Sequence, residues 1–535
     1  MTSLFVIEAP GKISTIEKIL RSINFPASVV ATKGRLYDLP SDSLGFDPKT
    51  LSEISYEALH TDVLRSLRKA IESHENIYIM TDSDAEGELI AHHIALLIPP
   101  EKKQFRLLCQ SITKDAIQRA LKEVTSVDEL KARGALNRRV FDRLSGFLLS
   151  KWDGQDSYEN GTVGRILTPL LKSLRETASY PVSVFRKEIQ TNCGPVMLQI
   201  KKTIDCIHSD QSIMNILAST HDAMAVKKSE SVHAVQVEAM SGHQALVYMA
   251  DRTNESIKNV ADSLQRMYEK GMISYARTES RALSSHAAKA VATIANRIGD
   301  KVNVEFINER NDHKIVTHDG LHVTQYNQAI EGAYDAMTLD DKLWTLIYRN
   351  NVSQLKDVIA TKSQYQLESS SLELLKGHKG ISIDAFRSVA VERGYRKEQY
   401  FDDVTGLCPE LSRGWACTAK VDVFVAEQLL KLGLGRPSTI PYHSEKVASH
   451  YLDSQGQLNF RGISSLQRAL ATAPLMLSLE RVHEVDRILL EGGDLKQTIL
   501  LSLQEVGLTK DLMNSIFISL PTEKAASQIS EYNLE

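Results

Sequence analysis

The sequence lacks several features that would assign it to common protein classes. No uninterrupted apolar run reaches the length of about 18 residues that a membrane-spanning helix needs. No Gly-x-x-x-x-Gly-Lys-Ser/Thr phosphate loop is present, which argues against ATP as a cofactor. The N-terminus has neither the basic nor the long apolar segment of a signal peptide. We therefore expect a cytoplasmic protein that does not enter a membrane and does not use ATP.

Cysteine and basic charge are also scarce. The five cysteines are odd in number, lie far apart and form no Cys-x-x-Cys pair, which favours a reducing compartment and argues against structural zinc. The net charge is −4, so the whole chain carries no signature of nucleic-acid binding, and such a partner would require local basic surfaces. With 535 residues the chain is too long for one core, and we expect several domains.

Strand and helix patterns alternate in the N-terminal part of the chain. Residues 4–8 and 77–81 are apolar runs typical of buried strands, whereas residues 12–21 and 59–73 have helical spacing. This alternation predicts an open α/β sheet over about residues 1–125. Sites in such sheets form at the carboxyl ends of the strands, so we expect Glu8 and the acidic residues after the later strand to meet.

Four carboxylates follow that later strand within seven positions: Asp82, Asp84, Glu86 and Glu88. Crowded like charges destabilise a fold unless a cation neutralises them, and their oxygen atoms suit Mg²⁺. The alternative is structural, because acidic residues are favoured at the N-termini of helices by the helix dipole. Spacing alone leaves both interpretations open.

Downstream, residues 110–150 look helical, and Arg139, Arg143 and Gly146 fall on one face of that helix. That face is either a solvated surface with ion pairs or a surface that another helix or a ligand approaches at the glycine. The pattern turns β-like at about 180–235 and again at 361–400, and most of the remainder is helical.

A segment around Tyr275 interrupts the helical pattern of residues 250–300. Gly271 fits a helix C-cap, and Ile273, Tyr275 and Arg277 would share one face if the segment were a strand. A tyrosine in this position is usually part of a core. The functional alternative is a phenolic nucleophile, with a guanidinium nearby that stabilises the phenolate and the phosphoryl oxygens it attacks.

Taken together, these segments resemble the type IA DNA topoisomerases. The glutamate, proline and lysine of the family's first-strand motif correspond to Glu8, Pro10 and Lys12, and its active-site tyrosine corresponds to Tyr275. The similar segments occur in family order and cover most of the chain: residues 8–12, 34–39, 81–88, 138–146, 164–167, 268–280, 317–320 and 433–439. Their joint occurrence is far more specific than any one of them.

The chain departs from the family pattern in four places. Ala85 stands where the family has arginine, Arg35 replaces a histidine, Leu167 replaces a glutamine, and His322 stands where an arginine is usual. No cysteine follows Cys417, so no zinc-ribbon tail is expected. The resemblance therefore implies a divergent, compact member, similar to topoisomerase III or to enzymes of mobile elements, and encoded by a bacterium, plasmid or phage.

The resemblance also implies a chemistry. Tyr275 would attack a DNA phosphate and form a 5′-phosphotyrosine, Glu8 would act as acid/base group or metal ligand, and Lys12 and Arg277 would stabilise the transition state. Single-stranded or negatively supercoiled DNA would be the substrate, and a monomeric enzyme would relax or decatenate it without ATP. The implied Mg²⁺ ligands are Glu8, Asp82, Asp84 and Glu86, and the implied DNA-binding residues are Arg138, Arg139, Arg143, Arg165, Gln265, His318, Arg436 and Ser438.

The architecture implied is multidomain, with α/β, α and β parts that form a four-domain toroidal clamp. The expected domains are a Rossmann-like Toprim domain, a helical DNA-groove domain, a β-rich arch and a helical domain with the tyrosine. Their ranges are, in that order, 1–125; 126–180 with 401–535; 181–235 with 330–400; and 236–329. Two other functions remain open: another Toprim enzyme, such as a primase or an OLD-like nuclease, and a catalytically impaired protein that only binds single-stranded DNA.

Overall fold

The structure is a computed structural model that divides into two units. One unit contains residues 1–173 and 458–535, and the other contains residues 174–457. Thr317 and the polar end of the chain at 521–535 lie outside the described residues. The described residues are 3–41, 43–47, 54–150, 161–176, 181–203, 206–235, 237–310, 318–356, 358–392, 399–402, 406–407, 416–417, 420–453 and 456–508.

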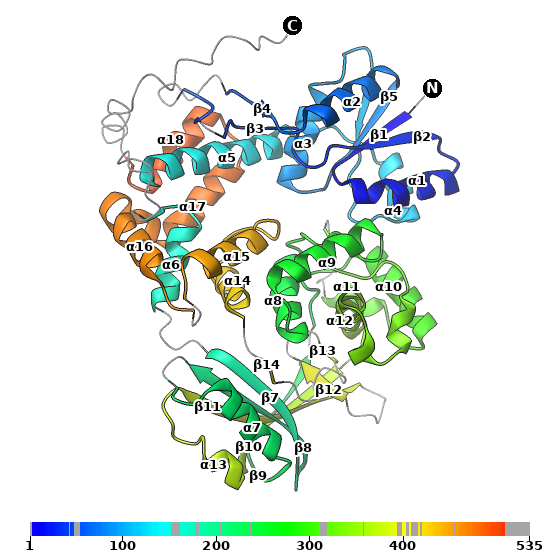
Figure 1. The fold of residues 1–535 in the computed structure, drawn as a ribbon. Coiled ribbons are helices and arrows are strands. Elements are labelled where there is room, and N and C mark those ends of the chain that lie inside the picture. The colour runs from blue at the N-terminus through cyan, green and yellow to red at the C-terminus, as the bar shows by residue number, and fades with distance from the viewer. Residues whose placement is uncertain are drawn as a thin grey trace. The chain divides into compact units, whose positions relative to one another are not determined.

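The first unit contains a four-stranded parallel sheet in the order β2-β1-β5-β6 (Figure 1). Strand β1 (Ser3–Ile7) lies between β2 (Ala27–Ala31) and β5 (Asn76–Met80), and β6 (Lys103–Arg106) completes the sheet. All five residues of β1 are buried, as expected for a central parallel strand that reads as a continuous apolar run. The predicted α/β sheet is therefore confirmed.

Helices connect these strands and pack on the sheet. The pattern at 12–21 becomes a short 3₁₀ turn, η1 (Pro10–Lys12), followed by α1, and the pattern at 59–73 becomes α2. Helix α2 buries Val63, Leu67 and Ile71, which are four residues apart and form one apolar stripe. These helices and the small two-stranded antiparallel sheet of the first unit are α1 (Ile13–Ser22), α2 (Thr61–Glu72), α3 (Ala85–Ala95), α4 (Lys114–Lys122), β3 (Tyr37–Asp38) and β4 (Glu57–Ala58).

The rest of the first unit is a helical core that joins segments far apart in the sequence. Phe141 of α5 is fully buried in one cluster with Leu489 of α17 and Ile499 of α18. Helix α6 (Leu167–Glu176) begins in this unit and leads into the second. The helices of the core are α5 (Glu129–Ser150), α16 (Phe460–Thr472), η5 (Pro474–Leu477), α17 (Leu479–Leu490) and α18 (Leu495–Glu505).

The second unit contains a long, mainly antiparallel sheet in the order β10-β9-β7-β8-β11-β12-β13, with β14 paired to β7 and an additional pairing of β10 with β11. The predicted β segments are confirmed, but two helices that the sequence analysis missed interrupt them: α7 (Asp210–Ser219) and α13 (Ser370–Glu373). The strands are β7 (Pro181–Thr191), β8 (Gly194–Thr203), β9 (Asp222–Val235), β10 (Val358–Glu368), β11 (Ile381–Glu392), β12 (Gln399–Asp402), β13 (Gly406–Leu407) and β14 (Ala416–Cys417).

The helices of the second unit form its apolar core. Trp344 of α12 is fully buried and stacks on Tyr348, and helix α14 packs against α8 while α15 packs against α9. The elements are α8 (Gly242–Thr253), α9 (Ile257–Glu269), α10 (Ser285–Ile298), α11 (Glu305–Arg310), η3 (Gln328–Glu331), η4 (Tyr334–Ala336), α12 (Leu339–Gln354), α14 (Val421–Lys431) and α15 (Ile440–His450). The four-domain partition predicted from the sequence remains a prediction.

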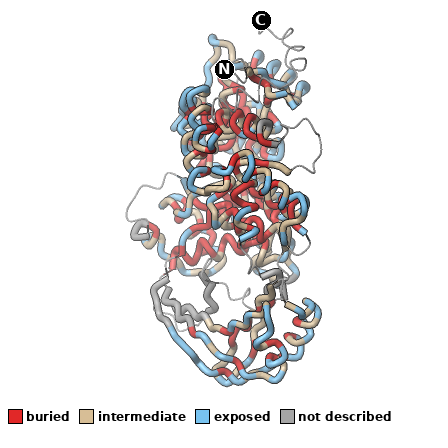
Figure 2. The backbone as a smooth tube through the Cα atoms, turned by 90° about the vertical axis from the view of Figure 1, so that its left-hand side faces the viewer, coloured by how far each residue is buried: buried red, intermediate tan, exposed pale blue. Residues whose placement is uncertain are grey.

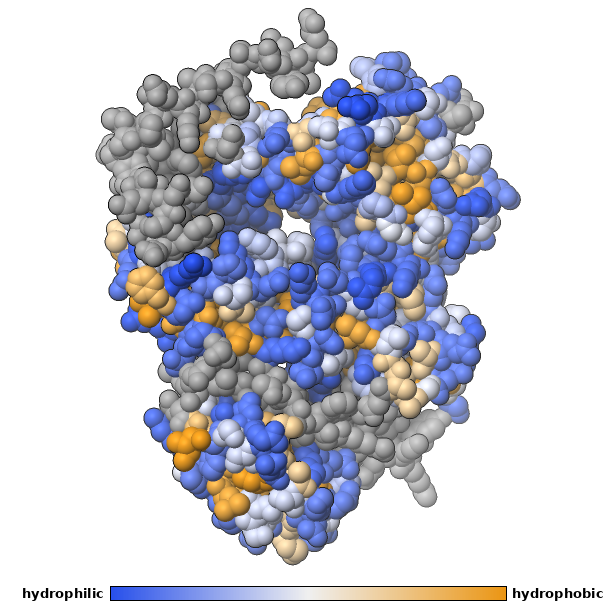
Figure 3. Space-filling model, viewed as in Figure 1, coloured by the Kyte–Doolittle hydropathy of each residue, from blue (hydrophilic) through white to orange (hydrophobic). Residues whose placement is uncertain are grey.

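Burial and surface polarity agree with these cores. Figure 2 shows buried residues concentrated in the helical parts, whereas much of the second sheet is exposed or intermediate. Hydrophilic side chains cover most of the described surface visible in Figure 3. No helix among the described residues combines the length and apolar character that a membrane-spanning helix requires.

Candidate functional site

Residues 81–88, here called the acidic turn, connect strand β5 to helix α3. Asp84 is the N-cap of α3, and its carboxylate accepts a hydrogen bond from the Gly87 amide at 2.7 Å. A Cβ atom on Gly87 would lie 2.0 Å from the carbonyl oxygen of Asp82, so the turn requires glycine there. The structural interpretation of the acidic run therefore holds for Asp84, which caps the helix.

Asp82 forms an ion pair with Lys12, and the side chains of both residues are buried, at 4% and 3% exposure. Lys12 ends the 3₁₀ turn that follows β1, and Asp82 follows β5. These strands are parallel neighbours, with Ile7 opposite Met80, so their carboxyl ends lie at the same edge of the sheet. The two strand ends are therefore neighbours, as expected, and Glu8 directly follows β1, whereas a contact between Glu8 and the acidic residues remains a prediction.

Glu88 pairs with Arg106, a residue that the sequence analysis missed. The guanidinium is fully buried and lies 2.9 Å from the Glu88 carboxylate. It also donates hydrogen bonds of 2.8–3.2 Å to the backbone carbonyls of Ile79, Thr81, Asp82 and Leu107. Arg106 thereby fixes the backbone under the acidic turn, and Glu88 serves as its buried counter-ion. A lone arginine at the end of a short strand gave no signal of this role.

Arg35 links the acidic turn to helix α5. Its Nε lies 2.6 Å from Oε1 of Glu86, and its Nη1 lies 2.8 Å from Oδ2 of Asp38. Arg139 of α5 binds the same Asp38 carboxylate with two bonds, of 2.8 and 2.5 Å. Charges of opposite sign therefore alternate from Glu86 to Arg35, Asp38 and Arg139.

In this network the pKa values of the two carboxylates, Glu86 and Asp38, are shifted in opposite directions. Desolvation raises the pKa of Glu86 although 43% of its side chain is exposed, and the charge of Arg35 offsets this only partly. Burial also acts to raise the pKa of Asp38, but the hydrogen bond from Arg139 and the charge of Arg35 outweigh it. The pKa of Asp38 is therefore held below its ordinary value.

The described acidic residues do not form a ready metal site. Their oxygen atoms are the ligands that Mg²⁺ prefers, yet the described residues contain no group of three or more His, Cys, Asp or Glu side chains placed to hold an ion. Asp82, Glu86 and Glu88 are paired with Lys12, Arg35 and Arg106, and Asp84 is bonded to an amide. The residues as arranged do not fit the predicted ion, so we derive no step through a metal.

The other arginines around α5 bind neighbouring elements of the first unit. The Arg165 side chain is 5% exposed and lies between Asp142 and Asp486, at 3.1 and 2.8 Å. Arg138 lies 3.5 Å from the same Asp486, and Arg143 donates to backbone carbonyls that include that of Ser43, at 2.7 Å. These contacts join different elements rather than residues four apart on one helix. The predicted DNA contacts of these arginines remain predictions, and Arg165 would have to exchange both aspartates to make one.

Gly146 lies on the same helix, and the sequence left open whether a helix or a ligand approaches it. No atom of the described part of the chain lies within 4 Å of where its Cβ would be. A described helix therefore does not explain this glycine.

Residues 271–280, here called the tyrosine loop, follow helix α9. Gly271 has a φ of 71° and its amide donates to the carbonyl of Tyr268 at 2.8 Å, as expected for a helix C-cap. The strand considered for residues 273–277 is not formed. Among the described residues, this segment makes a single β-bridge, between Ile273 and Val323. Tyr275 is 7% exposed, and its ring packs edge-on against Tyr268 with centroids 5.3 Å apart.

Backbone contacts from two other segments hold the tyrosine loop. The Gly242 amide donates to the Thr278 carbonyl at 2.7 Å, and a Cβ on Gly242 would lie 2.1 Å from the carbonyl oxygen of Ala276. On the other side, the Ser274 amide donates to the carbonyl of His322 at 2.8 Å, and the His322 amide donates to Oγ of Ser274 at 2.9 Å. The start of α8 and the segment after Asp319 therefore fix the loop on both sides of Tyr275.

Of the other predicted DNA-binding residues of the second unit, Arg436 contacts this loop. Arg436 forms an ion pair of 2.5 Å with Glu279, which joins the Gly-Leu-Gly-Arg-Pro-Ser-Thr segment to the tyrosine loop. His318 and Ser438 are exposed, and Gln265 of α9 donates to Glu269 at 2.9 Å. The structure thus brings Arg436 to the loop across 157 positions of sequence.

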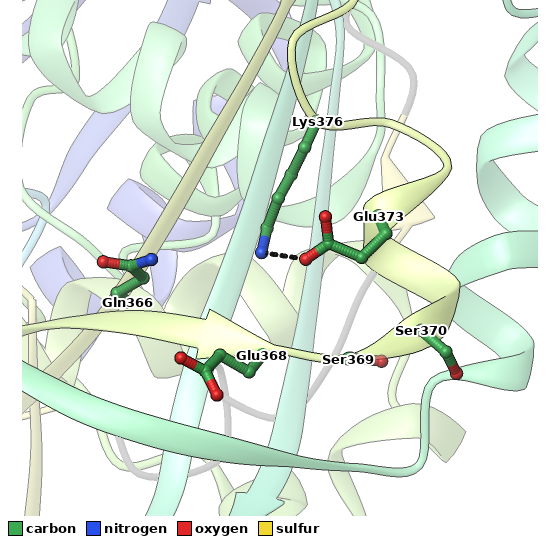
Figure 4. A pocket seen from close by; sticks show the side chains of 6 residues that line it. All are labelled: Gln366, Glu368, Ser369, Ser370, Glu373 and Lys376. Carbon is green, nitrogen blue, oxygen red and sulfur yellow. Dashed lines mark hydrogen bonds and ion pairs between the residues drawn. The ribbon is translucent and has the colours of Figure 1, made fainter.

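A polar pocket in the sheet region of the second unit is lined by residues that are distant in sequence from all of the residues above. Glu373 and Lys376 form an ion pair across it, as Figure 4 shows. It holds none of the residues predicted from the sequence, and we do not assign it a function. Its lining residues are Gln366, Glu368, Ser369, Ser370, Glu373 and Lys376.

Comparison with known proteins identifies the family. A Toprim domain model matches residues 3–109, and a model described as DNA topoisomerase matches residues 126–460. DNA topoisomerase 1 of Campylobacter jejuni is 24% identical over 413 residues, which are 70% of this chain and 58% of that protein. The protein of the same name from Aquifex aeolicus is 25% identical over 470 residues, which are 82% of this chain and 84% of that protein.

The chain spans 58% of the length of the Campylobacter jejuni relative and of a Buchnera aphidicola relative with the same name. The structure of full-length topoisomerase I from Thermotoga maritima has a TM-score of 0.59 and 18% identity, and the match covers 96% of this chain and 89% of that one. This likeness shows the fold. Because the DNA topoisomerase model covers more than half of the chain and follows a Toprim match, the chain belongs to the type IA DNA topoisomerase family.

Proposed function

We propose that the protein is an ATP-independent DNA topoisomerase that cuts one strand, passes another strand through the gap and reseals the cut. The tyrosine loop is the observation that carries this proposal. Its nucleophile candidate, Tyr275, lies in a loop held on both sides by hydrogen bonds from Gly242 and His322. A tyrosine on a backbone held in this way suits attack on a bound phosphate, because fixing the backbone lowers the entropy cost of aligning the nucleophile.

The proposed chemistry is a balanced exchange of phosphodiester bonds. The Tyr275 oxygen bonds to the phosphorus and its proton leaves to a base, while the bond from phosphorus to the 3′ oxygen breaks and that oxygen takes a proton. The 5′ phosphate stays on Tyr275, and attack by the 3′-hydroxyl reverses each change. One phosphodiester replaces another, so no ATP is consumed. Arg277 and Lys12 would stabilise the phosphoryl oxygens. Glu8 would act as the acid/base group at the 3′ oxygen.

We further propose that single-stranded or negatively supercoiled DNA is the substrate. Arg436 supports this, because a phosphate is a natural competitor for a guanidinium that is paired with an exposed carboxylate such as Glu279. Contacts by Gln265, His318 and Ser438 belong to the same proposal. A monomeric state, a topoisomerase III-like or mobile-element subtype and dependence on Mg²⁺ remain predictions of the family resemblance.

The test is relaxation of a negatively supercoiled plasmid with Mg²⁺ and without ATP, for the natural protein and Tyr275→Phe. We expect relaxation by the natural protein and none by the variant. The matched control is Tyr442→Phe, which removes another tyrosine hydroxyl from the same unit at a position 59% exposed. Relaxation by both the natural protein and Tyr275→Phe, or by neither, contradicts the proposal. Linked plasmid circles with a single-stranded gap would show whether decatenation is the faster reaction.

A denaturing gel with end-labelled oligonucleotides separates the alternative functions. A topoisomerase leaves protein on the 5′ end of the cut, and this adduct is absent in Tyr275→Phe. Cleavage without an adduct would indicate another Toprim enzyme, such as an OLD-like nuclease, and primer synthesis would indicate a primase. Binding of the oligonucleotide with neither outcome would indicate an impaired DNA-binding protein.

A further inference from the structure

We propose that Asn351 of helix α12 is a positioning residue for Tyr275, because its buried carboxamide fixes residues 321–323 and these in turn hold the tyrosine loop. This role deepens the proposed function and rests on it, since it assumes that Tyr275 attacks the DNA phosphate. Asn351 lies outside all of the sequence segments that resemble the family.

The place of Asn351 in the helix is the first indication of a special role. Asn351 and its neighbour Asn350 are both 0% exposed, in the last turns of α12. Asparagine is a poor helix former, and a buried amide costs free energy unless its hydrogen bonds are made. An apolar residue would be cheaper here if the position only filled space. The partners of the Asn351 carboxamide therefore indicate what it does.

Both polar atoms of this carboxamide bond to one backbone segment. Oδ1 accepts a hydrogen bond from the Val323 amide, and Nδ2 donates one to the Leu321 carbonyl, each at 3.0 Å. In an extended chain, the backbone groups of residues two positions apart point to the same side. The carboxamide therefore pairs with residues 321–323 as a peptide group of a neighbouring strand would.

The opposite side of the same segment holds the tyrosine loop. The Ser274 amide donates to the His322 carbonyl at 2.8 Å, and the His322 amide donates to Oγ of Ser274 at 2.9 Å. One turn of the pattern later, the Thr324 amide donates to the Met272 carbonyl at 3.0 Å. One side of the segment thus faces α12, and the other side faces the loop just before Tyr275.

Loss of the carboxamide should therefore reach the nucleophile through the backbone. The Leu321 carbonyl and the Val323 amide would lose their partner at residues that are both 0% exposed, so the segment must move to pair them again. The loop would move with it, because His322 lies between these two residues. A displacement of about 1 Å at a reacting group costs about 100-fold in rate. If Asn351 only stabilised the helix packing, folded molecules would react at the normal rate.

Hydrogen exchange with mass spectrometry tests the position of the loop directly in the full-length protein. Amides of residues 272–278 should exchange at least tenfold faster in Asn351→Leu than in the natural protein, since the local opening of the loop becomes easier. The matched control is Tyr348→Phe in the same helix. It removes a buried hydroxyl that donates to Asp300 at 2.6 Å, away from the loop, and should leave the exchange of residues 272–278 unchanged.

Single-turnover cleavage of an end-labelled oligonucleotide separates positioning from DNA binding. Asn351→Leu should lower the rate constant of adduct formation at saturating DNA at least tenfold and change the half-saturating DNA concentration less than twofold. Asn351→Asp is the second variant. Its neutral carboxyl has one donor and one acceptor, as the carboxamide has, and burial favours that form. Its rate deficit should therefore be smaller at pH 6 than at pH 8, unlike that of Asn351→Leu.

Circular dichroism melts show that each variant is folded. Natural exchange and natural rate constants in both Asn351 variants overturn the proposal, and so does equal exchange of residues 272–278 in Asn351→Leu and Tyr348→Phe. Absence of an adduct with the natural protein would contradict the proposed function of Tyr275. The exchange comparison needs no strand cleavage, so it would still decide whether Asn351 fixes the loop.

Discussion

The acidic turn and the tyrosine loop are fixed by different forces. In the acidic turn, side-chain charges dominate: Lys12, Arg35 and Arg106 each hold one carboxylate. In the tyrosine loop, backbone hydrogen bonds and a close contact at Gly242 determine the path of the chain. Both regions depend on one glycine at which a Cβ would collide with a carbonyl oxygen.

This difference determines where the two regions can exchange a binding partner. Of the three ion pairs of the acidic turn, only Arg35–Glu86 has an exposed edge, at which a phosphate could compete for the guanidinium. The backbone hydrogen bonds around Tyr275 offer no such exchange, and in the tyrosine loop it is the ion pair between Glu279 and Arg436 that has an exposed edge. The acidic turn is therefore held by charge and the backbone around Tyr275 by hydrogen bonds, so single substitutions should affect the two regions differently.

The largest expected effect is on the stability of the first unit, through the charges that hold the acidic turn. Arg106→Met should lower the free energy of unfolding of the first unit by about 3–5 kcal/mol, because Glu88 would remain buried without a cation. Calorimetric or urea unfolding measures this. The double change Arg106→Met with Glu88→Leu should recover only part of the loss, since the carbonyls of Ile79, Thr81 and Asp82 still lose their donor. A loss below about 1 kcal/mol in the single variant would contradict the role assigned to Arg106.

One buried histidine in each unit gives the next effect, through pH. Burial lowers the pKa of His93 to about 4, with further lowering by the charges of His92 and Arg35. Burial also lowers the pKa of His243 to about 4, although its hydrogen bond with the carbonyl of Ala426 acts to raise that pKa. The unfolded chain, with a histidine pKa of about 6.5, binds more protons below that pH, so stability is lost as pH falls from about 6.5 to 4.

Each histidine should contribute up to about 3 kcal/mol to this loss. Hydrogen exchange at pH 7 and pH 5 separates the two units. His93→Gln should flatten the pH dependence of the first unit alone, and His243→Gln that of the second. An unchanged pH dependence in both variants would show that other groups cause it.

Part of this comparison was predictable from the sequence and part was not. Apolar runs located β1 and β5, and parallel topology placed Glu8 and Asp82 at one edge, because these inferences need only local patterns and a general rule about sheets. The pairing of Arg35 with Glu86 depends on how the segment before β3 lies in space, which no spacing encodes.

The tyrosine loop shows a second limit. Ile273, Tyr275 and Arg277 alternate as a strand would, but the Thr278 carbonyl is bonded to Gly242 at the start of a helix rather than to a neighbouring strand. Side-chain alternation does not reveal where backbone groups find their partners. Helix α7 was missed for a similar reason, since the β-rich sequence around it dominated the pattern.

The glycines test both regions with the same change. Gly87→Ala and Gly242→Ala should each cost about 1–3 kcal/mol, because the added Cβ would lie 2.0 or 2.1 Å from a carbonyl oxygen and the backbone must shift. Gly146→Ala is the matched control in α5, where no described atom is near, and should be neutral or stabilising by up to about 1 kcal/mol. Thermal unfolding measures all three. Equal stability of the three variants would remove the packing argument.

The smallest expected effect on stability comes from the ion pair that joins Arg436 to the tyrosine loop. Glu279→Gln should change stability by less than about 1 kcal/mol, since the side chains are 31% and 61% exposed. Its effect on DNA should be opposite to that of Arg436→Gln. Loss of Glu279 leaves Arg436 without its carboxylate competitor and should tighten binding of a single-stranded oligonucleotide, whereas loss of Arg436 should weaken binding and reduce the slope of log K against log salt by about 1. Fluorescence anisotropy across a salt series measures both. If Arg436→Gln leaves the slope unchanged, the guanidinium does not bind DNA phosphate and only stabilises the loop through its ion pair with Glu279. The tyrosine loop would then be held in part by charge, as the acidic turn is.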